Sequence, residues 1–317
     1  MAINFTDHGG AVIQFVRVYL IFWGSAWASN PPPTPTTAQV TDAINRILSG
    51  GYMTGLAQYR GIGQGYILGS TTVTSSSPAQ GFTDAQVATL VQGLISAGTI
   101  PNLDRDNQTL YCVFTPKGIG HQGGGAIGEH TYYTDSSNRR VHFAWVTNNG
   151  TLSEISIIAS HEIGESCTDP EGSAILGDAG TCSGGGWCEI GDVCQGTDGT
   201  VNGASVQSLW SQKDKACVVF DYPAYSFPIH GVQFTGTLAA NQSQRWFTFN
   251  WPAWWQTFWT VMPTTINTAG AQVTWSVQVQ RASGAYITYW VTVTNTTNVP
   301  INFEARYQVL GLWNTAS

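Results

Sequence analysis

Hydrophobic residues follow two different periods along the chain. Up to about residue 221, apolar strand-like runs alternate with segments whose apolar residues recur every three or four positions, as in amphipathic helices. From about residue 227, apolar and polar residues alternate with period two, the pattern of strands with one buried face. We therefore predict an α/β (α+β) domain over residues 1–224 and an antiparallel β-sandwich over residues 225–317.

The first domain contains runs of β-branched and aromatic residues as well as amphipathic segments. The runs predict strands at Val12–Gly24, Thr109–Thr115 and Val141–Val146, and two short ones around Gln58–Ile62 and around Tyr66. Amphipathic spacing predicts helices at Thr37–Leu48, from Thr83 to about Ala97, and at Leu152–Glu165. Strands that alternate with helices at this spacing indicate helices packed on a sheet.

The second domain contains six alternating segments separated by turn signals. They are Gly231–Leu238, Arg245–Trp251, Thr257–Met262, Gln272–Gln280, Ala285–Thr294 and Ile301–Leu310. Strand alternation places Phe247, Phe249 and Trp251 on one face, opposite Trp246. These aromatic residues form either a sandwich core or an exposed platform for sugar rings, a partner protein or a membrane interface.

The overall composition narrows the function classes. Charged residues make up 10% of the 317 residues and hydrophobic ones 42%, so the chain forms cores and is not disordered. A net charge of -7 argues against nucleic acid and against electrostatic docking to anionic membranes. The apolar run Val12–Trp23 is interrupted by Gln14 and Arg17 and is too short to span a bilayer, so we expect no transmembrane segment.

Six cysteines permit complete pairing and fit an oxidising compartment, so we expect a secreted, extracellular protein. The first residues show no signal peptide, and this expectation therefore includes a leader that the chain does not carry. The alternative is a set of free thiols. Local spacing favours two pairs and leaves a third: Cys182–Cys188, Cys194–Cys217 and Cys112–Cys167.

The helix predicted over Leu152–Glu165 ends in the sequence His161-Glu-Ile-Gly-Glu165. Residues four apart share one face of a helix, so His161 and Glu165 can hold one ion together. The zinc-peptidase pattern H-E-x-x-H uses two histidines as ligands and the glutamate as base. Here Glu165 replaces the second histidine, and we assign the general base to Glu162.

Further carboxylates follow this helix. Glu189 and Asp192 lie between Cys188 and Cys194, and Asp169 lies at the helix end. One histidine and two carboxylates can hold zinc with an open position for water, and either Glu189 or Asp192 would complete that set. Asp169 is an accessory candidate.

The extra carboxylate makes the predicted site more anionic than H-E-x-x-H, which weakens the Lewis acidity of zinc. Zinc is our first candidate, and a harder ion such as calcium or manganese is the alternative. The alternative to any metal is a local hydrogen-bonding network of His161 and Glu162 at the end of the helix.

Two more histidines, His121 and His130, lie in the glycine-rich segment Pro116–His130. Either can supply a ligand or a substrate contact. The alternative is a pair of solvated loop histidines.

These motifs, in this order, resemble those of the EXORDIUM-like, phosphate-induced protein family over about residues 12–220. The segments that carry the resemblance are Gly128-Glu-His130-Thr131, Phe143-Ala-Trp-Val146, His161-Glu-x-x-Glu165, Thr168-Asp-Pro170, Glu189-Ile-Gly-Asp-x-Cys194, Val206-Gln-x-x-Trp210 and Cys217. The resemblance implies a secreted domain with a zincin-like fold. This chain is shorter between Cys194 and Trp210 than we expect for the family, and it lacks the family's cysteine before His130. The second domain is not part of the resemblance.

Together these patterns predict a secreted metal-dependent hydrolase, metallopeptidase-like, with a β-sandwich binding module. Its expected partners are a peptide, a protein or a cell-surface polysaccharide, and not a nucleic acid. The alternative is a non-catalytic extracellular binding or structural protein on a zincin-like fold, because a fold does not imply an activity.

Overall fold

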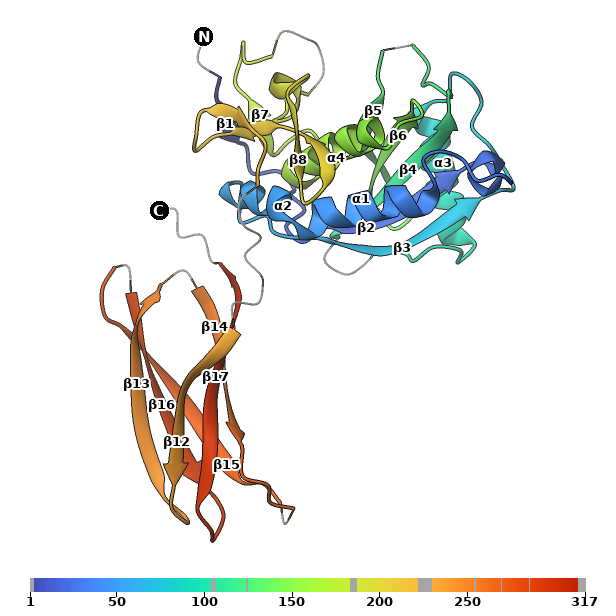
Figure 1. The fold of residues 1–317 in the computed structure, drawn as a ribbon. Helices are drawn as coiled ribbons and strands as arrows, with labels where there is room; N and C mark the ends of the chain where they lie inside the picture. The colour runs from blue at the N-terminus through green and yellow to red at the C-terminus, as the bar shows by residue number, and fades with distance from the viewer. Residues whose placement is uncertain are drawn as a thin grey trace. The chain divides into compact units, whose positions relative to one another are not determined.

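The chain divides into two compact units, Met1–Ala224 and Tyr225–Ser317 (Figure 1). The computed structural model describes residues 3–103, 107–123, 125–182, 187–221, 230–253, 255–268, 270–284 and 286–312. Strands outnumber helices in this part of the chain, and several of the sheets are antiparallel, so the predicted mixture of α and β structure is confirmed. No helix within the described ranges has the length and hydropathy needed to cross a membrane.

A five-stranded mixed sheet forms the centre of the first unit, in the order β3-β2-β4-β6-β5 (Figure 1). Its strands are β2 (Arg17–Trp23), β3 (Tyr66–Val73), β4 (Thr109–Lys117), β5 (Gly128–Thr134) and β6 (Arg140–Asn148). Four strands are parallel, and β5 pairs antiparallel with β6 at the edge. β4 is buried on both faces, which explains its continuous run of apolar residues.

Helices cover both faces of this sheet. α1 (Thr37–Ser49) and α4 (Leu152–Thr168) share one core with strand residues such as Leu20. α3 (Asp84–Ser96) shares the opposite core with the neighbouring residue Ile21. Successive side chains of a strand point to opposite faces, so the two cores take alternate residues of each strand.

Each of these helices begins at a threonine whose side chain accepts a backbone hydrogen bond, as expected of an N-cap. The N-caps are Thr36, Thr83 and Thr151. α4 continues three residues beyond the predicted end, to Thr168, and stops before Pro170. The motif residues of α4 therefore lie within the helix and not at its frayed end.

The strand predicted at Gln58–Ile62 is wrong. The chain there forms two short helices, α2 (Gly51–Gly55) and η2 (Leu56–Gln58), followed by a turn in which Arg60 has φ 53°. A third short helix, η1 (Ser25–Ala28), follows β2.

Three short antiparallel ribbons complete the first unit, and β9 of one of them packs on α4. β1 pairs with β7, β8 with β9, and β10 with β11. Their bounds are β1 (Phe5–Asp7), β7 (Ile175–Gly177), β8 (Asp198–Val201), β9 (Ala204–Gln207), β10 (Leu209–Ser211) and β11 (Ala216–Val218). The short helix η3 (Asp192–Cys194) lies between β7 and β8 in sequence.

Two of the three predicted disulfides are confirmed, Cys182–Cys188 and Cys194–Cys217. The third is wrong, because Cys112 and Cys167 are free thiols. Both are fully buried in the core between the sheet and α4, where a thiol packs as a small apolar side chain. Burial raises the pKa of both thiols, which keeps them protonated and unreactive in the folded protein.

The second unit contains two three-stranded antiparallel sheets, β12-β17-β14 and β13-β16-β15. The strands are β12 (His230–Leu238), β13 (Ser243–Pro252), β14 (Trp255–Pro263), β15 (Val273–Arg281), β16 (Tyr286–Asn295) and β17 (Ile301–Leu312). Residues of both sheets form one core, which includes Trp259, Val291 and Phe303. The alternating pattern thus corresponds to a sandwich of two sheets.

The predicted shared face of Phe247, Phe249 and Trp251 is wrong for Trp251. The pairing of β13 with β16 shifts register between Thr248 and Trp251, and Asn250 there has φ 63°. This bulge turns Trp251 into the core, where it is 7% exposed. Phe247 and Phe249 stay on the outer face, 58% and 62% exposed.

Candidate metal centre

α4 places three functional side chains together. His161 and Glu165 are one turn apart, with His161 Nε2 2.9 Å from Glu165 Oε2. Glu162 Oε1 lies 4.0 Å from the same ring nitrogen. Glu162 and Glu165 are buried, and the His161 side chain is 12% exposed.

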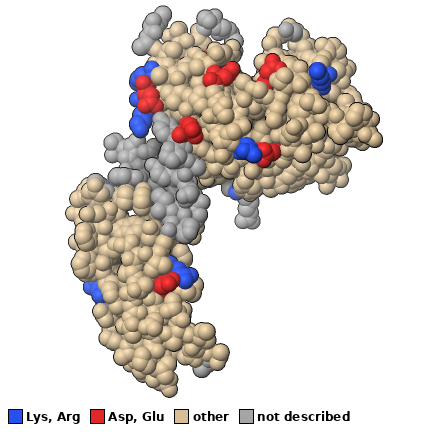
Figure 2. Space-filling view, viewed as in Figure 1, with Lys and Arg blue, Asp and Glu red and all other residues tan. Residues whose placement is uncertain are grey.

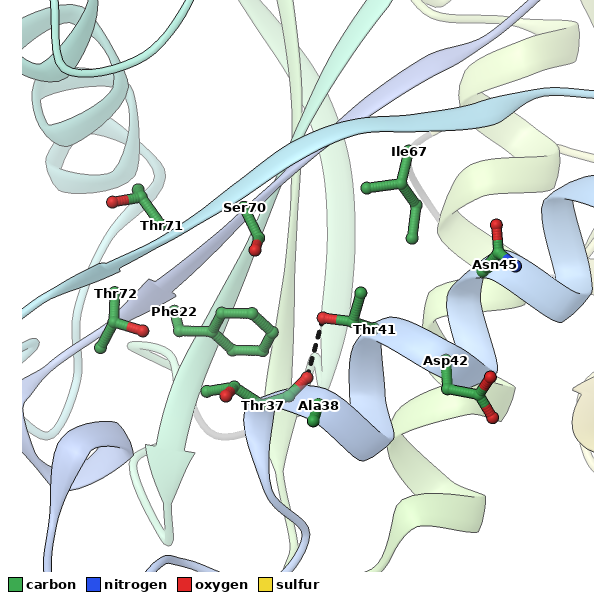
Figure 3. Close-up of a pocket in the computed structure, with 10 residues that line it drawn as sticks. All are labelled: Phe22, Thr37, Ala38, Thr41, Asp42, Asn45, Ile67, Ser70, Thr71 and Thr72. Carbon is green, nitrogen blue, oxygen red and sulfur yellow. Dashed lines mark hydrogen bonds between the residues drawn. The ribbon is translucent and has the colours of Figure 1, made fainter.

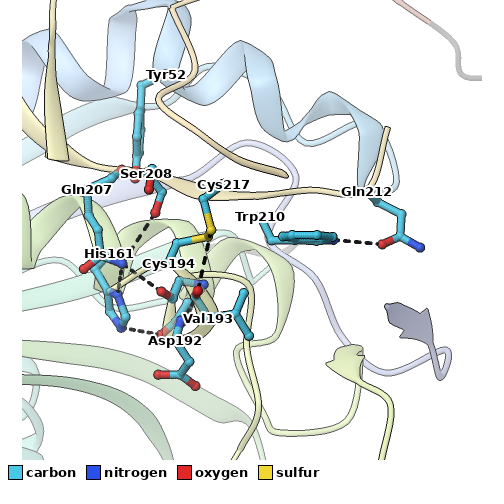
Figure 4. The surroundings of a disulfide bond; sticks show 12 residues. Tyr52, His161, Asp192, Val193, Cys194, Gln207, Ser208, Trp210, Gln212 and Cys217 are labelled. Carbon is cyan, nitrogen blue, oxygen red and sulfur yellow. Dashed lines mark hydrogen bonds and ion pairs between the residues drawn. A yellow bond between two sulfur atoms is a disulfide. The ribbon is translucent and has the colours of Figure 1, made fainter. Parts of the chain in front are cut away.

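The loop that contains Asp192 closes over this helix. Glu165 Oε1 accepts hydrogen bonds from the backbone N–H of Gly191 (3.0 Å) and of Asp192 (3.2 Å). His161, Glu165 and Asp192 each offer a ligand atom, and these three atoms lie within 4.8 Å of one another. The disulfide Cys194–Cys217 holds the loop next to His161 (Figure 4).

His130 reaches the same place from the edge strand β5. Its Nδ1 lies 3.5 Å from Glu162 Oε2 and 3.8 Å from Glu165 Oε2. The residue is 4% exposed, so the alternative of a solvated loop histidine is wrong. Sequence spacing gave His130 only an accessory role, because its position depends on the antiparallel pairing of β5 with β6.

Glu189 joins His130 and Glu165 in a second group whose ligand atoms lie within 4.8 Å of one another. Glu189 Oε1 is 3.2 Å from His130 Nε2 but has no hydrogen-bond partner among the described residues. The same Nε2 lies 3.1 Å from the backbone carbonyl of Asp169. A carbonyl only accepts, so we assign the Nε2 proton to that bond, which leaves the Glu189 oxygen unsatisfied.

Asp169 supports the site from behind. Its Oδ1 accepts the backbone N–H groups of Ser173 (2.7 Å) and Ala174 (2.8 Å), and its carbonyl receives His130. Asp169 therefore orients His130 and belongs to neither donor group.

Gln207 on β9 is a site residue that motif reasoning missed. Its Nε2 donates to the Gly191 carbonyl at 2.8 Å and lies 2.8 Å from His161 Nδ1 (Figure 4). An amide N–H aimed at Nδ1 places the ring proton on Nε2, facing Glu165. The only sequence signal for this role is the Val206-Gln207 segment within the family resemblance.

These side chains line a cavity of about 420 Å³. Its lining includes five carboxylates and two histidines, and none of the described lining residues is Lys or Arg. The seven are Glu129, His130, His161, Glu162, Glu165, Glu189 and Asp192. Trp187 forms part of the wall, with its ring centroid 5.6 Å from that of His130.

A larger cavity, about 640 Å³, lies between α1 and β3 (Figure 3). Threonine, serine and apolar residues line it, and its one acidic residue, Asp42, pairs with Arg46. It lacks the reactive groups of the smaller cavity.

Burial and mutual repulsion disturb the acids of the cluster. Burial raises the pKa of Glu189 to about 8 and that of Asp192 to about 6. Burial also works to raise the pKa of Glu165, but the neighbouring His161 outweighs it and the pKa is lowered. The buried acids thus need protons or cations to coexist.

At the two histidine rings, burial and the neighbouring carboxylates shift the pKa in opposite directions. Burial alone lowers the pKa of a histidine, but Glu165 and Glu162 outweigh it and raise the pKa of His161 to about 10. Glu189 and Glu162 likewise raise the pKa of His130 well above its usual value. At His161 the Gln207 amide opposes this shift, because it already donates to Nδ1. A second proton on the ring, at Nδ1, would face the Gln207 donor.

The donor set fits a divalent transition metal. Imidazole nitrogens and carboxylate oxygens are ligands of zinc and manganese, and the unsatisfied, buried Glu189 oxygen is the kind of atom that a cation satisfies. The fit to calcium is poorer, because calcium takes six to eight oxygen ligands.

A third group, Asp84, His121 and Glu129, lies nearby. His121 Nε2 is 3.5 Å from Asp84 Oδ1, and the ring stacks on Trp145 with centroids 4.6 Å apart. The His121 side chain is 13% exposed, so it too is not a solvated loop histidine.

Comparisons of the chain with protein-family models, with curated proteins and with solved structures find no match.

Proposed function

We propose that the first unit is a metal-dependent hydrolase, peptidase-like, on a zincin-like domain related to the EXORDIUM-like proteins. The observation that carries the proposal is the cavity in which five carboxylates and two histidines meet without a Lys or Arg among the described lining residues. Buried charges are costly unless they are paired or coordinate a metal. In this proposal His161, Glu165 and Asp192 hold the ion. His161 Nε2 gives up its proton to bind the ion, and the Gln207 side-chain amide turns so that its oxygen accepts a hydrogen bond from Nδ1.

A bound divalent ion supplies Lewis acidity, which polarises a carbonyl group and favours a water nucleophile at neutral pH. Glu162 acts as the general base. It lies within 4.0 Å of a nitrogen of each ring yet belongs to neither donor group, so its carboxylate stays free to accept a proton. The backbone amides of Gly191 and Asp192 orient the Glu165 carboxylate.

The substrate class follows from the cavity walls. Trp187 is 38% exposed and offers a flat apolar surface beside His130. Such a wall suits a peptide side chain or a sugar ring, and we favour a peptide because of the peptidase-like motif. Two disulfides support an extracellular location.

The test combines elemental analysis with one substitution. We expect zinc or manganese in the purified full-length chain, and hydrolysis of members of a broad peptide library. Glu162→Gln should keep the metal and abolish hydrolysis. Glu154→Gln is the matched control, because Glu154 is exposed in the first turn of the same helix and its carboxylate only accepts the hydroxyl of the N-cap Thr151. A protein that binds no metal, or a Glu162→Gln variant with full activity, contradicts the proposal.

A second candidate is a non-catalytic extracellular binding protein. The observation that favours it is the chain of hydrogen bonds from Gln207 through His161 to Glu165, which satisfies His161 without an ion. This candidate predicts that a chelator changes neither the metal content nor the melting temperature.

We propose that the second unit binds polysaccharide. On the outer face of β13 and β16, Phe247 lies 6.1 Å from Phe249 and 5.2 Å from Trp290, and Arg245 covers Trp290 at 4.3 Å. A row of exposed aromatic rings suits the apolar faces of sugar rings. Replacing Phe247 and Phe249 by alanine should abolish retention on insoluble polysaccharide. Phe258→Ala, an exposed aromatic of the other sheet, should not. Equal retention of both variants contradicts this proposal.

Figure 2 is consistent with these partners. On the face shown, charged residues are sparse and neither sign forms a continuous patch. A surface with few cationic side chains favours uncharged polymers over nucleic acids.

A further inference from the structure

Glu165 belongs to two donor groups at once. One group contains His161 and Asp192, and the other contains His130 and Glu189. The atoms of each group lie within 4.8 Å of one another. The two groups therefore meet at a single carboxylate.

The orientation of Glu165 suits this double role. Its Oε1 is held by the backbone amides of Gly191 and Asp192. Its Oε2 lies between the two rings, 2.9 Å from His161 Nε2 and 3.8 Å from His130 Nδ1. Backbone hydrogen bonds to one oxygen fix the other in place between the two histidines.

The His130 side has ligand atoms of its own. The Nε2 proton faces the Asp169 carbonyl, so a neutral ring turns its Nδ1 lone pair toward Glu162 and Glu165. A ring nitrogen whose partner N–H is held by a backbone carbonyl is a common arrangement in metal-ligating histidines. Glu189, 5% exposed, adds the buried oxygen that has no hydrogen-bond partner among the described residues.

Charge supports a second ion. One divalent cation carries two positive charges into a cavity lined by five carboxylates, so with a single ion some of the remaining acids must keep their protons. Two such cations bring the cluster much closer to neutrality, and burial makes the uncompensated state costly.

We propose that the centre holds two divalent cations that share Glu165 as a ligand. One cation also binds His161 and Asp192. The other also binds His130 and Glu189. This inference rests on the proposed function but adds a second ion to it.

The test uses Mn²⁺ and the full-length wild-type chain. The protein is stripped with a chelator, titrated with Mn²⁺, and freed of excess ion by gel filtration. Elemental analysis should find about two equivalents per chain, and two ions that share a ligand lie about 3.5–4 Å apart. At that distance their unpaired electrons couple, so electron paramagnetic resonance should lose the six-line signal of isolated Mn²⁺.

Two variants locate the second ion. Glu189→Gln should reduce the content to about one equivalent and restore the isolated signal, because it removes a ligand of the second ion only. His121→Gln is the control, since it removes a ligand atom of the neighbouring third group. It should leave the coupled pair unchanged.

The outcomes separate the two proposals. One equivalent with an isolated signal in the wild type overturns the shared site and leaves a single-ion hydrolase. Two equivalents without coupling also overturn the sharing of Glu165. No retained Mn²⁺ and no retained zinc overturns the proposed function itself. The metal content and the resonance signal of the wild type test the shared site even if a variant fails to fold.

Discussion

An alanine at position 191 would place a methyl group between His161 and Glu165. Gly191 has φ −84° and ψ −34°, a conformation open to any L-residue, so the substitution adds no backbone strain. The added Cβ would lie 2.6 Å from His161 Nδ1 and 2.7 Å from Glu165 Oε1. The substitution therefore acts on the centre alone.

Both distances are well below ordinary contact, so the loop or the two side chains must move. Extra volume in a packed site costs about 1–3 kcal/mol. For a domain of this size, each kcal/mol lowers the melting temperature by about 2–4 °C, which gives a decrease of about 2–12 °C. Disturbing the groups that orient a ligand typically weakens metal binding by about 10–100-fold.

Differential scanning calorimetry and isothermal titration with Zn²⁺ measure the two effects in the full-length chain. Gly93→Ala is the matched control, because Gly93 lies in α3 with nothing within 4 Å of its added Cβ. That change should raise stability by about 0.8–1 kcal/mol. Unchanged stability and unchanged Zn²⁺ affinity in Gly191→Ala would refute the conclusion that this loop closes the metal centre.

Three further predictions concern the first unit. Replacing Cys194 and Cys217 by alanine opens a closure of 23 residues and should cost about 3.4 kcal/mol in urea unfolding, whereas an unchanged midpoint would contradict the entropic model. Gly128→Ala puts a Cβ 2.5 Å from an oxygen of the proposed base, so hydrolysis should fall by about tenfold or more with metal content unchanged; equal loss of metal would count against this separation. Burial lowers the pKa of His142 from 6.5 despite its hydrogen bond to Glu171. As the pH falls through 6.5, the unfolded chain therefore binds a proton at His142 before the folded chain does, and the folded state loses stability toward acid. His142→Gln should remove that acid-induced loss when unfolding is compared at about pH 5 and about pH 8, and an identical pH dependence would contradict it.

Local rules account for the part of the centre that the sequence predicts. The i, i+4 spacing brings His161 and Glu165 together on any helix. Glu189 and Asp192 lie three residues apart between cysteines, so one short loop brings both to the site. The backbone N–H of Glu189 donates to Asp192 Oδ2 at 3.0 Å. These contacts depend on neighbours in sequence.

Two residues depend on long-range pairing: His130, which sequence spacing identifies only as an accessory candidate, and Gln207, which it misses. His130 reaches the cluster because β5 turns back against β6, with His130 opposite Ala144. Gln207 reaches it because β9 packs beside α4, where Ser160 Oγ accepts its backbone N–H at 2.9 Å. No spacing within the chain encodes either approach.

The same limit holds for the fold. Capped amphipathic segments and most buried runs are predicted close to their observed bounds, since their signals are local, but the strand predicted at Val12–Gly24 begins only at Arg17. One bulged register, between Thr248 and Trp251, was enough to send Trp251 to the opposite face. The turn at Arg60 likewise needs a left-handed backbone conformation, which an arginine in the sequence does not predict.

The two free thiols have a practical consequence. Cys112 and Cys167 come from different elements, yet both are sealed in the layer between the sheet and α4. An alkylating reagent can reach them only when that layer opens, whereas the four remaining cysteines are already paired in the two disulfides. The rate at which these two thiols are alkylated, measured by mass spectrometry, therefore reports how often the first unit opens, without any engineered label.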